Sequence, residues 1–185
     1  EHLYKLGEGT KINTNTFAPN STLEDGLIGH WTFNGSDMTL ATATDKSGNG
    51  NDGTLTNGPM KVIGKLGQGL SFDGVDDEIY TTTNYGNSTS ISRVTISAWF
   101  KTSSASGRKF IGLQENQVGT AGDYDRQLWM GVDGKIRFGV YTTHLNEVAS
   151  DDFLNDGSWH HAVGVSTGDN GTMTLYIDGI EQDSM

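Results

Sequence analysis

The sequence contains no cysteine and only 2 prolines among its 185 residues. The missing cysteines exclude a disulfide framework and any metal site that uses thiolates. No segment reaches the roughly 20 consecutive apolar residues that a membrane-spanning helix needs. Basic residues are scarce: 12 Lys and Arg stand against 23 Asp and Glu, giving a formal net charge of −11. This balance argues against nucleic acid and anionic membranes as partners, because both are held by clustered Lys and Arg.

Glycine and turn-forming residues are abundant instead. The chain has 26 glycines and 34% hydrophobic residues, and no window shows a sustained helical stripe. Residues 135–141 and 172–177 alternate apolar and polar positions with the period of two that half-buried antiparallel strands have. Asp-Gly turns recur throughout, beginning at Asp25, Asp52, Asp73, Asp133, Asp156 and Asp178. These features predict an all-β chain of successive hairpins, long enough for one domain with a full core.

Two segments, residues 45–53 and 70–80, are rich in carboxylate and amide oxygens and are interrupted by glycines. Hard oxygen ligands of this kind are those that Ca²⁺ prefers, in sets of six to eight. The predicted metal ligands are Asp45, Asn49, Asp73 and Asp77, with Asp52 and Asp76 as the second choice. The alternative is that Asn and Gly form the turns for conformational reasons and that the charges are only solvated.

The two segments together resemble the laminin G-like jelly rolls of the concanavalin A-like lectin/glucanase superfamily. Three further motifs follow in the family's order: residues 27–33, residues 94–101, and residues 159–163 running on to 175–179. Five motifs in the right order are far more specific than any one glycine-rich loop. The resemblance implies a two-sheet antiparallel β-sandwich with Trp31 and Trp99 in its core.

The resemblance also defines the expected domain organisation. Residues 27–185 form the jelly-roll domain, and residues 1–26, which are polar and lack aromatic anchors, form a linker or an extended segment that docks on a partner. The family has further strands after residue 179, so we expect the sandwich to lack its last strands and to leave an open sheet edge. Another part of the polypeptide or another copy would cover that edge.

A second oxygen-rich stretch lies between two predicted strands. Its candidate ligand-binding residues are Asp123, Tyr124, Asp125 and Trp129. Carboxylates beside aromatic rings can hydrogen-bond and stack against a sugar. The alternative is that Trp129, which alternates with Leu128 and Met130, belongs to the core, and that Asp125 pairs with Arg126.

The remaining candidates indicate structural roles. Adjacent His160 and His161 point to opposite faces of a strand and cannot readily share a zinc ion, and His30 and His144 are isolated. Glycoside hydrolysis generally needs two carboxyl groups across a cleft. The Glu-x-Asp-x-x-Glu pattern of the glucanase relatives is absent, so we predict no enzymatic activity.

The sequence therefore predicts a noncatalytic, extracellular or cell-surface binding and adhesion module, stabilised by Ca²⁺, that recognises carbohydrate or a surface glycoprotein. The alternative is a structural spacer or assembly subunit of a large surface protein or extracellular filament. In either case other copies or neighbouring domains would bind through residues 1–26 and the open sheet edge.

Overall fold

The computed structural model describes residues 25–81, 93–107, 109–114, 124–141, 145–168 and 171–185. Within these ranges the chain is built from short strands, which confirms the predicted all-β class. The elements are a 3-10 helix η1 (Gly35–Asp37) and the strands β1 (Thr42–Ala43), β2 (Gly53–Thr56), β3 (Met60–Ile63), β4 (Gln68–Ser71), β5 (Glu78–Thr81), β6 (Val94–Lys101), β7 (Lys109–Gln114), β8 (Tyr124–Met130), β9 (Ile136–Tyr141), β10 (Leu145–Ala149), β11 (Trp159–Ser166), β12 (Met173–Ile177) and β13 (Ile180–Ser184). No helix in the described ranges is long and apolar enough to cross a bilayer.

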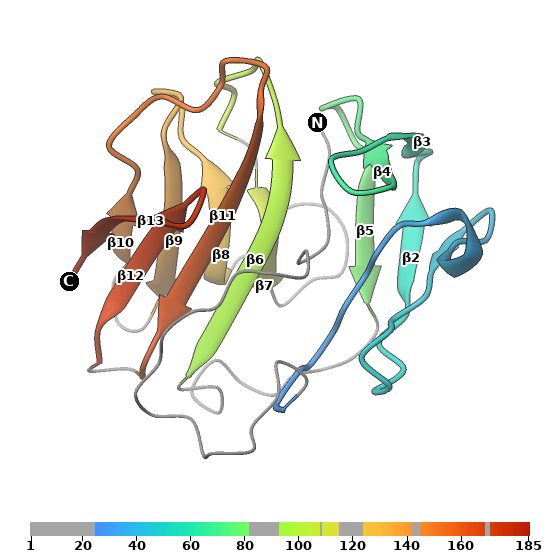
Figure 1. Cartoon of the computed structure of the whole chain (residues 1–185), viewed down its shortest axis with the longest axis horizontal. Helices are drawn as coiled ribbons and strands as arrows, with labels where there is room; N and C mark the ends of the chain where they lie inside the picture. The colour runs from blue at the N-terminus through green and yellow to red at the C-terminus, as the bar shows by residue number, and fades with distance from the viewer. Residues whose placement is uncertain (1–24, 82–92, 108, 115–123, 142–144, 169–170) are drawn as a thin grey trace.

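Two four-stranded antiparallel sheets form the sandwich, with strand orders β13-β12-β11-β6 and β10-β9-β8-β7. Figure 1 shows the first sheet in front of the second. Between them lies the larger hydrophobic cluster, in which Phe100, Leu128, Phe138 and Leu175 are almost completely buried. This arrangement is the β-sandwich that the sequence motifs predict.

Strand alternation determines which side chains enter that cluster. In β6, Ile96, Ala98 and Phe100 are buried against the second sheet. Trp99 lies between two of these residues in sequence and therefore projects from the opposite face, since successive strand residues point to opposite sides. That outer face contacts a second, separate layer of the molecule.

The second layer is formed by the sheet β1-β2-β5 and the two-stranded sheet β3-β4, which lie on the right in Figure 1. Its own cluster buries Phe33, Met38, Ala43 and Leu70. Three tryptophans, Trp31, Trp99 and Trp159, pack against this cluster while partly exposed. The prediction that Trp31 and Trp99 lie in the core of the sandwich is wrong, because both pack in the junction between the two layers.

Candidate functional site

The first oxygen-rich loop is organised around the carboxylate of Asp45, which is only 7% exposed. Oδ1 accepts hydrogen bonds from the backbone N–H groups of His30 at 2.9 Å and Ser47 at 2.8 Å. Oδ2 accepts from the Ser47 hydroxyl at 2.7 Å and from the Asn51 N–H at 3.0 Å. Burial alone would raise the pKa of Asp45, but these hydrogen bonds outweigh it and lower the pKa below the ordinary value.

The other polar groups of this loop also bond within the protein. The Asp52 carboxylate accepts from the Asp45 N–H at 2.8 Å. The side-chain amide of Asn49 donates to the Leu27 carbonyl at 2.6 Å, and the Trp31 indole N–H donates to the Asn51 carbonyl at 2.9 Å. Asp45 and Asn49 therefore hold the loop against the segment that enters the second layer.

The second loop brings three carboxylates together. One oxygen from each of Asp73, Asp76 and Asp77 lies within 4.8 Å of the other two. Two oxygens bound to one Ca²⁺ at 2.3–2.6 Å can be at most about 5 Å apart, so this spacing fits a shared ion. The loop is further shaped by the Asp73 N–H, which donates to Asp77 Oδ2 at 2.8 Å, and by the Val75 N–H, which donates to Asp73 Oδ1 at 2.8 Å.

The two loops do not meet. In the antiparallel β2–β5 pair, Gly53 is opposite Thr81 and Thr56 is opposite Glu78. The Asp45 loop immediately precedes Gly53 and the Asp73 loop immediately precedes Glu78, so the loops lie at opposite ends of the pair, about 10 Å apart along the strands. The prediction of one calcium site shared by Asp45, Asn49, Asp73 and Asp77 is wrong, because this register keeps the two loops apart. Of the predicted calcium ligands, Asp73 and Asp77 remain together, and Asp76 is the third carboxylate beside them.

Of the second set of candidates, Trp129 has a described side chain. Asp123 lies outside the described residues, as do the side chains of Tyr124 and Asp125. Leu128 and Met130 are buried in the inter-sheet cluster, whereas Trp129 is half-buried and projects from the other side of β8. The interpretation of Trp129 as a core residue is therefore wrong.

The Trp129 indole lies directly on the backbone of the neighbouring strand. A Cβ atom added at Gly139 would be 2.8 Å from the ring carbon Cη2 and 3.1 Å from Leu145 Cδ1. Only glycine leaves room for the ring in this position. In the strand register, Trp129 is opposite Arg137 of β9 on one side and Lys109 of β7 on the other.

Arg137 is held by two carboxylates on the same face of this sheet. Nη1 and Nη2 each donate to one oxygen of Asp133 at 2.7 Å, and Nε donates to Glu147 Oε1 at 3.3 Å. The bidentate bond from Arg137 keeps the pKa of Asp133 far below its usual range. We call this surface the Trp129 face; its residues are Gln127, Trp129, Asp133, Arg137, Gly139, Leu145 and Glu147.

The adjacent histidines take part in separate contacts. His160 Nδ1 lies 2.8 Å from Asp178 Oδ2, and Nε2 lies 3.3 Å from Asp156 Oδ1. His161 stacks on Trp99 with ring centroids 4.9 Å apart, and its Nε2 lies 2.8 Å from Ser97 Oγ. Burial lowers the pKa of His161, and the nearby Asp178 charge opposes that shift. The two rings thus belong to separate contact networks; His144 lies outside the described residues.

Sequence reasoning missed the partners of Trp129. Residues 135–141 were recognised as a strand, and its period of two places positions 137 and 139 on one face. The pairing of β8 with β9, which puts Arg137 and Gly139 beside Trp129, is a tertiary feature. A half-buried strand carrying both Arg and Gly on its polar side was the available signal.

The chain is similar to proteins of known family and structure. A family model described as the concanavalin A-like lectin/glucanases superfamily matches residues 73–185. An S-layer domain-containing protein from Clostridium thermocellum (residues 221–444) is 25% identical with a TM-score of 0.50, over 85% of this chain and 71% of that one. Domain 4 of AbnA, an extracellular GH43 arabinanase from Geobacillus stearothermophilus solved with arabinotriose, is 22% identical with a TM-score of 0.61, over 84% of this chain and 73% of that one. The search of curated proteins finds no match.

Proposed function

This chain belongs to the concanavalin A-like lectin/glucanase superfamily, and on that basis we propose that it is a noncatalytic, extracellular binding and adhesion module that recognises carbohydrate through the Trp129 face. The observation that carries the proposal is the half-exposed Trp129 ring lying on Gly139 among polar groups. The arabinanase domain with its bound arabinotriose supports a sugar as the ligand class. Residues 27–185 form the module, and residues 1–26 link it to its neighbours.

The Trp129 face suits a sugar for physical reasons. A sugar ring has an apolar C–H face that packs on an indole, while its hydroxyls need hydrogen-bond partners beside the ring. Gln127 and Glu147 offer such partners on the adjacent positions of the same face. Arg137 is already fixed by Asp133 and Glu147, so little side-chain freedom is lost when a ligand binds.

The same geometry disfavours hydrolysis. A glycosidase needs one carboxyl group that stays protonated near neutral pH to act as general acid. The Asp133 pKa is shifted strongly in the opposite direction, and both Asp133 and Glu147 are engaged by Arg137. Asp133 therefore does not suit the role of general acid.

We further propose that Ca²⁺ binds at Asp73, Asp76 and Asp77, whose oxygens have the spacing of ligands to one ion. When bound, the ion would neutralise three like charges crowded into one turn. The turn joins β4 to β5, and the Asp77 carboxylate already caps it by accepting from the Asp73 N–H. The residues themselves thus pre-form the corner that the ion would stabilise.

A glycan-array screen followed by titration calorimetry tests the carbohydrate proposal. The Trp129→Ala variant should lose at least about tenfold in affinity, which corresponds to about 1.4 kcal/mol, because the stacking surface is removed. Gly139→Val should act in the same way by displacing the ring. Phe153→Ala is the matched control, since Phe153 is an exposed aromatic residue outside the Trp129 face.

Affinity that is unchanged in Trp129→Ala, or reduced equally in Phe153→Ala, would contradict the assignment of the face. The absence of binding to every glycan on the array by the wild-type chain would contradict the proposed function itself.

A further inference from the structure

β3 and β13 are two of the edge strands of the described sheets, and each has one side that no described strand covers. β3 pairs with β4 alone, and β13 pairs with β12 alone, within the part of the chain that the structure describes. Each leaves a row of backbone N–H and C=O groups without a strand partner, which is a template for pairing with another chain. The two edges lie on opposite sides of the molecule, β13 on the left and β3 on the right in Figure 1.

The two edges carry opposite charge. The β3–β4 hairpin, residues 60–71, contains Lys61 and Lys65 and no acidic residue, although the whole chain has a net charge of −11. β13 contains Glu181 and Asp183 and no basic residue. Lys61, Glu181 and Asp183 are all exposed on their strands.

Both edges also present exposed apolar side chains. On β3, Met60 is 66% and Ile63 is 89% exposed. On β13 and the residue after it, Ile180 is 67% and Met185 is 57% exposed. Exposed apolar residues beside an unpaired edge are typical of a surface that binds another chain.

We propose that β3 of one copy of this chain pairs with β13 of a second copy by β-strand addition. Opposite charges on directly opposed strand positions stabilise a pairing and like charges destabilise it. When β3 pairs with β13, Lys61 is attracted to Glu181 or Asp183. Pairing of β3 with β3, or of β13 with β13, would instead place like charges opposite each other. The charges thus favour pairing of β3 with β13 over pairing of two β3 strands or of two β13 strands.

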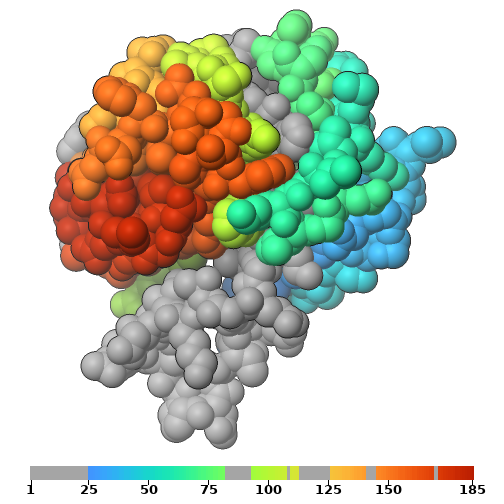
Figure 2. Space-filling model, turned by 45° about the horizontal axis from the view of Figure 1, so that its top comes forward, coloured from blue at the N-terminus to red at the C-terminus, as the bar shows by residue number. Residues whose placement is uncertain are grey.

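This contact joins different surfaces of identical molecules. Such a heterologous contact leaves a free β3 at one end and a free β13 at the other, so it adds copies into an open chain unless the geometry closes a ring. In the space-filling view the red C-terminal strands and the green hairpin are separated by the orange surface that includes β11, so one copy can use both edges at once (Figure 2).

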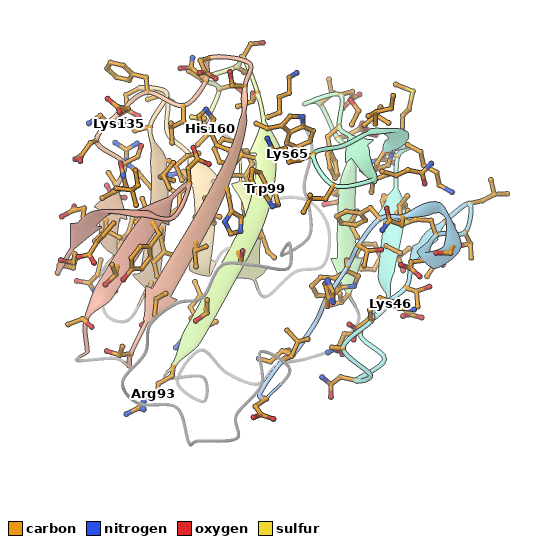
Figure 3. All side chains as sticks on the ribbon, viewed as in Figure 1. Lys46, Lys65, Arg93, Trp99, Lys135 and His160 are labelled. Atoms are coloured by element: carbon orange, nitrogen blue, oxygen red, sulfur yellow. The ribbon has the colours of Figure 1, made fainter. Side chains whose placement is uncertain are left out.

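Each edge is held in place before pairing. In the hairpin, Leu70 is completely buried, the Gln68 N–H donates to Asn34 Oδ1 at 3.1 Å, and the Lys65 ammonium lies 5.4 Å from the centre of the Trp99 ring. Figure 3 shows Lys65 and Trp99 side by side between the two layers. The turn before β13 is anchored by Asp178, whose Oδ1 accepts from the His161 N–H at 2.8 Å. Pre-ordered edges lose little conformational freedom on binding.

A charge-swap experiment tests the pairing in the whole chain by sedimentation velocity over a concentration series. The wild type should show a weight-average mass that rises with concentration to beyond that of a dimer. K61E, which places an acidic residue on β3 opposite the acidic β13 of the next copy, and E181K/D183K, with two basic edges, should each remain monomeric. An equimolar mixture of the two variants should recover the wild-type assembly, because each acidic edge then meets a basic one.

Lys101→Glu is the control for net charge, since Lys101 is exposed on β6, away from both edges, and it should assemble like the wild type. Trp129→Ala should also assemble normally, so failure of the glycan proposal and failure of this one are distinguishable. A monomeric wild type at every concentration, a mixture that stays monomeric, or an equal loss in Lys101→Glu would each overturn the pairing.

Discussion

Replacing Asp45 by Asn tests whether the first loop is held by its carboxylate rather than by an ion shared with the second loop. The substitution keeps the shape of the side chain and one carbonyl oxygen. That oxygen can serve either the His30 and Ser47 N–H groups or the pair formed by the Ser47 hydroxyl and the Asn51 N–H. The NH₂ group then faces two donors that have lost their acceptor.

The expected cost follows from those two lost bonds. Hydrogen bonds to a charged group contribute about 1.5–3 kcal/mol each. The Ser47 hydroxyl can turn to another acceptor, so the free energy of unfolding should fall by about 2–4 kcal/mol rather than by the full sum. For a chain of this size, about 2–4 °C of melting temperature is lost per kcal/mol, so a decrease on the order of 5–15 °C is expected.

Urea unfolding at pH 7, with calcium and with excess chelator, gives the measurement. Asp151→Asn is the control, because Asp151 is exposed and its carboxylate lacks a hydrogen bond in the described structure. The loss in Asp45→Asn should be the same with and without calcium. A loss below about 0.5 kcal/mol, the range of ordinary surface substitutions, or one that appears only in calcium, would refute the reasoning.

The same measurement should depend on pH in a defined direction. The folded-state pKa of Asp45 is lowered, so its contribution is fully present above the unfolded pKa of about 3.9 and is lost as the pH falls through the folded value. The difference between the wild type and Asp45→Asn should therefore shrink below about pH 4. A constant difference down to pH 2 would contradict the assigned cause.

Three further predictions follow from other parts of the structure. Calcium at 100 times its dissociation constant should stabilise the wild type by about 2.7 kcal/mol. The Asp77→Asn variant should lose most of the resulting shift in melting temperature. Equal shifts in the wild type and in Asp77→Asn would argue against the second loop as the calcium site. Because the His161 pKa is lowered in the folded protein, its contribution to stability is complete above about pH 6.5 and is lost as the pH falls through the folded value. His161→Gln should reduce that decline in pH-dependent melting curves, and an unchanged slope would contradict it. Gly131→Ala should break the bidentate bond between Arg137 and Asp133, because the added methyl would overlap the guanidinium; an Asp133 carboxyl that still resists protonation, measured by NMR titration, would show that the bond survives.

The fold could be predicted from the sequence because local patterns determine most of it. Alternation in residues 135–141 and 172–177, together with the ordered motifs, gave the strands and the sandwich. The prediction that Trp99 belongs to the core rests on its place in a strand motif of the family. Its packing against the second layer depends on which elements cover each face of β6, and local alternation carries no information about that.

The site was harder to predict for a related reason. Asp45 and Asp73 stand in similar loops, and their chemistry alone suggested one ion between them. Their separation is fixed by the register of β2 against β5, which depends on long-range pairing. For Trp129 the uncertainty lay in which face of its strand is buried. Alternation shows that Trp129 faces away from Leu128 and Met130, but it does not show which side is the core.

The division of the apolar residues into two clusters has a consequence for how the molecule opens. Among the described residues, the layer that carries both acidic loops rests on a cluster of four buried residues, whereas the cluster inside the sandwich has fourteen. Amides of β2 and β5 should consequently exchange with deuterium sooner than those of β8 and β9, since regions with little buried apolar surface open at lower free energy. Trp129 and Arg137 lie in the sandwich, so on warming the proposed carbohydrate site should stay folded after the loop of the proposed calcium site has opened.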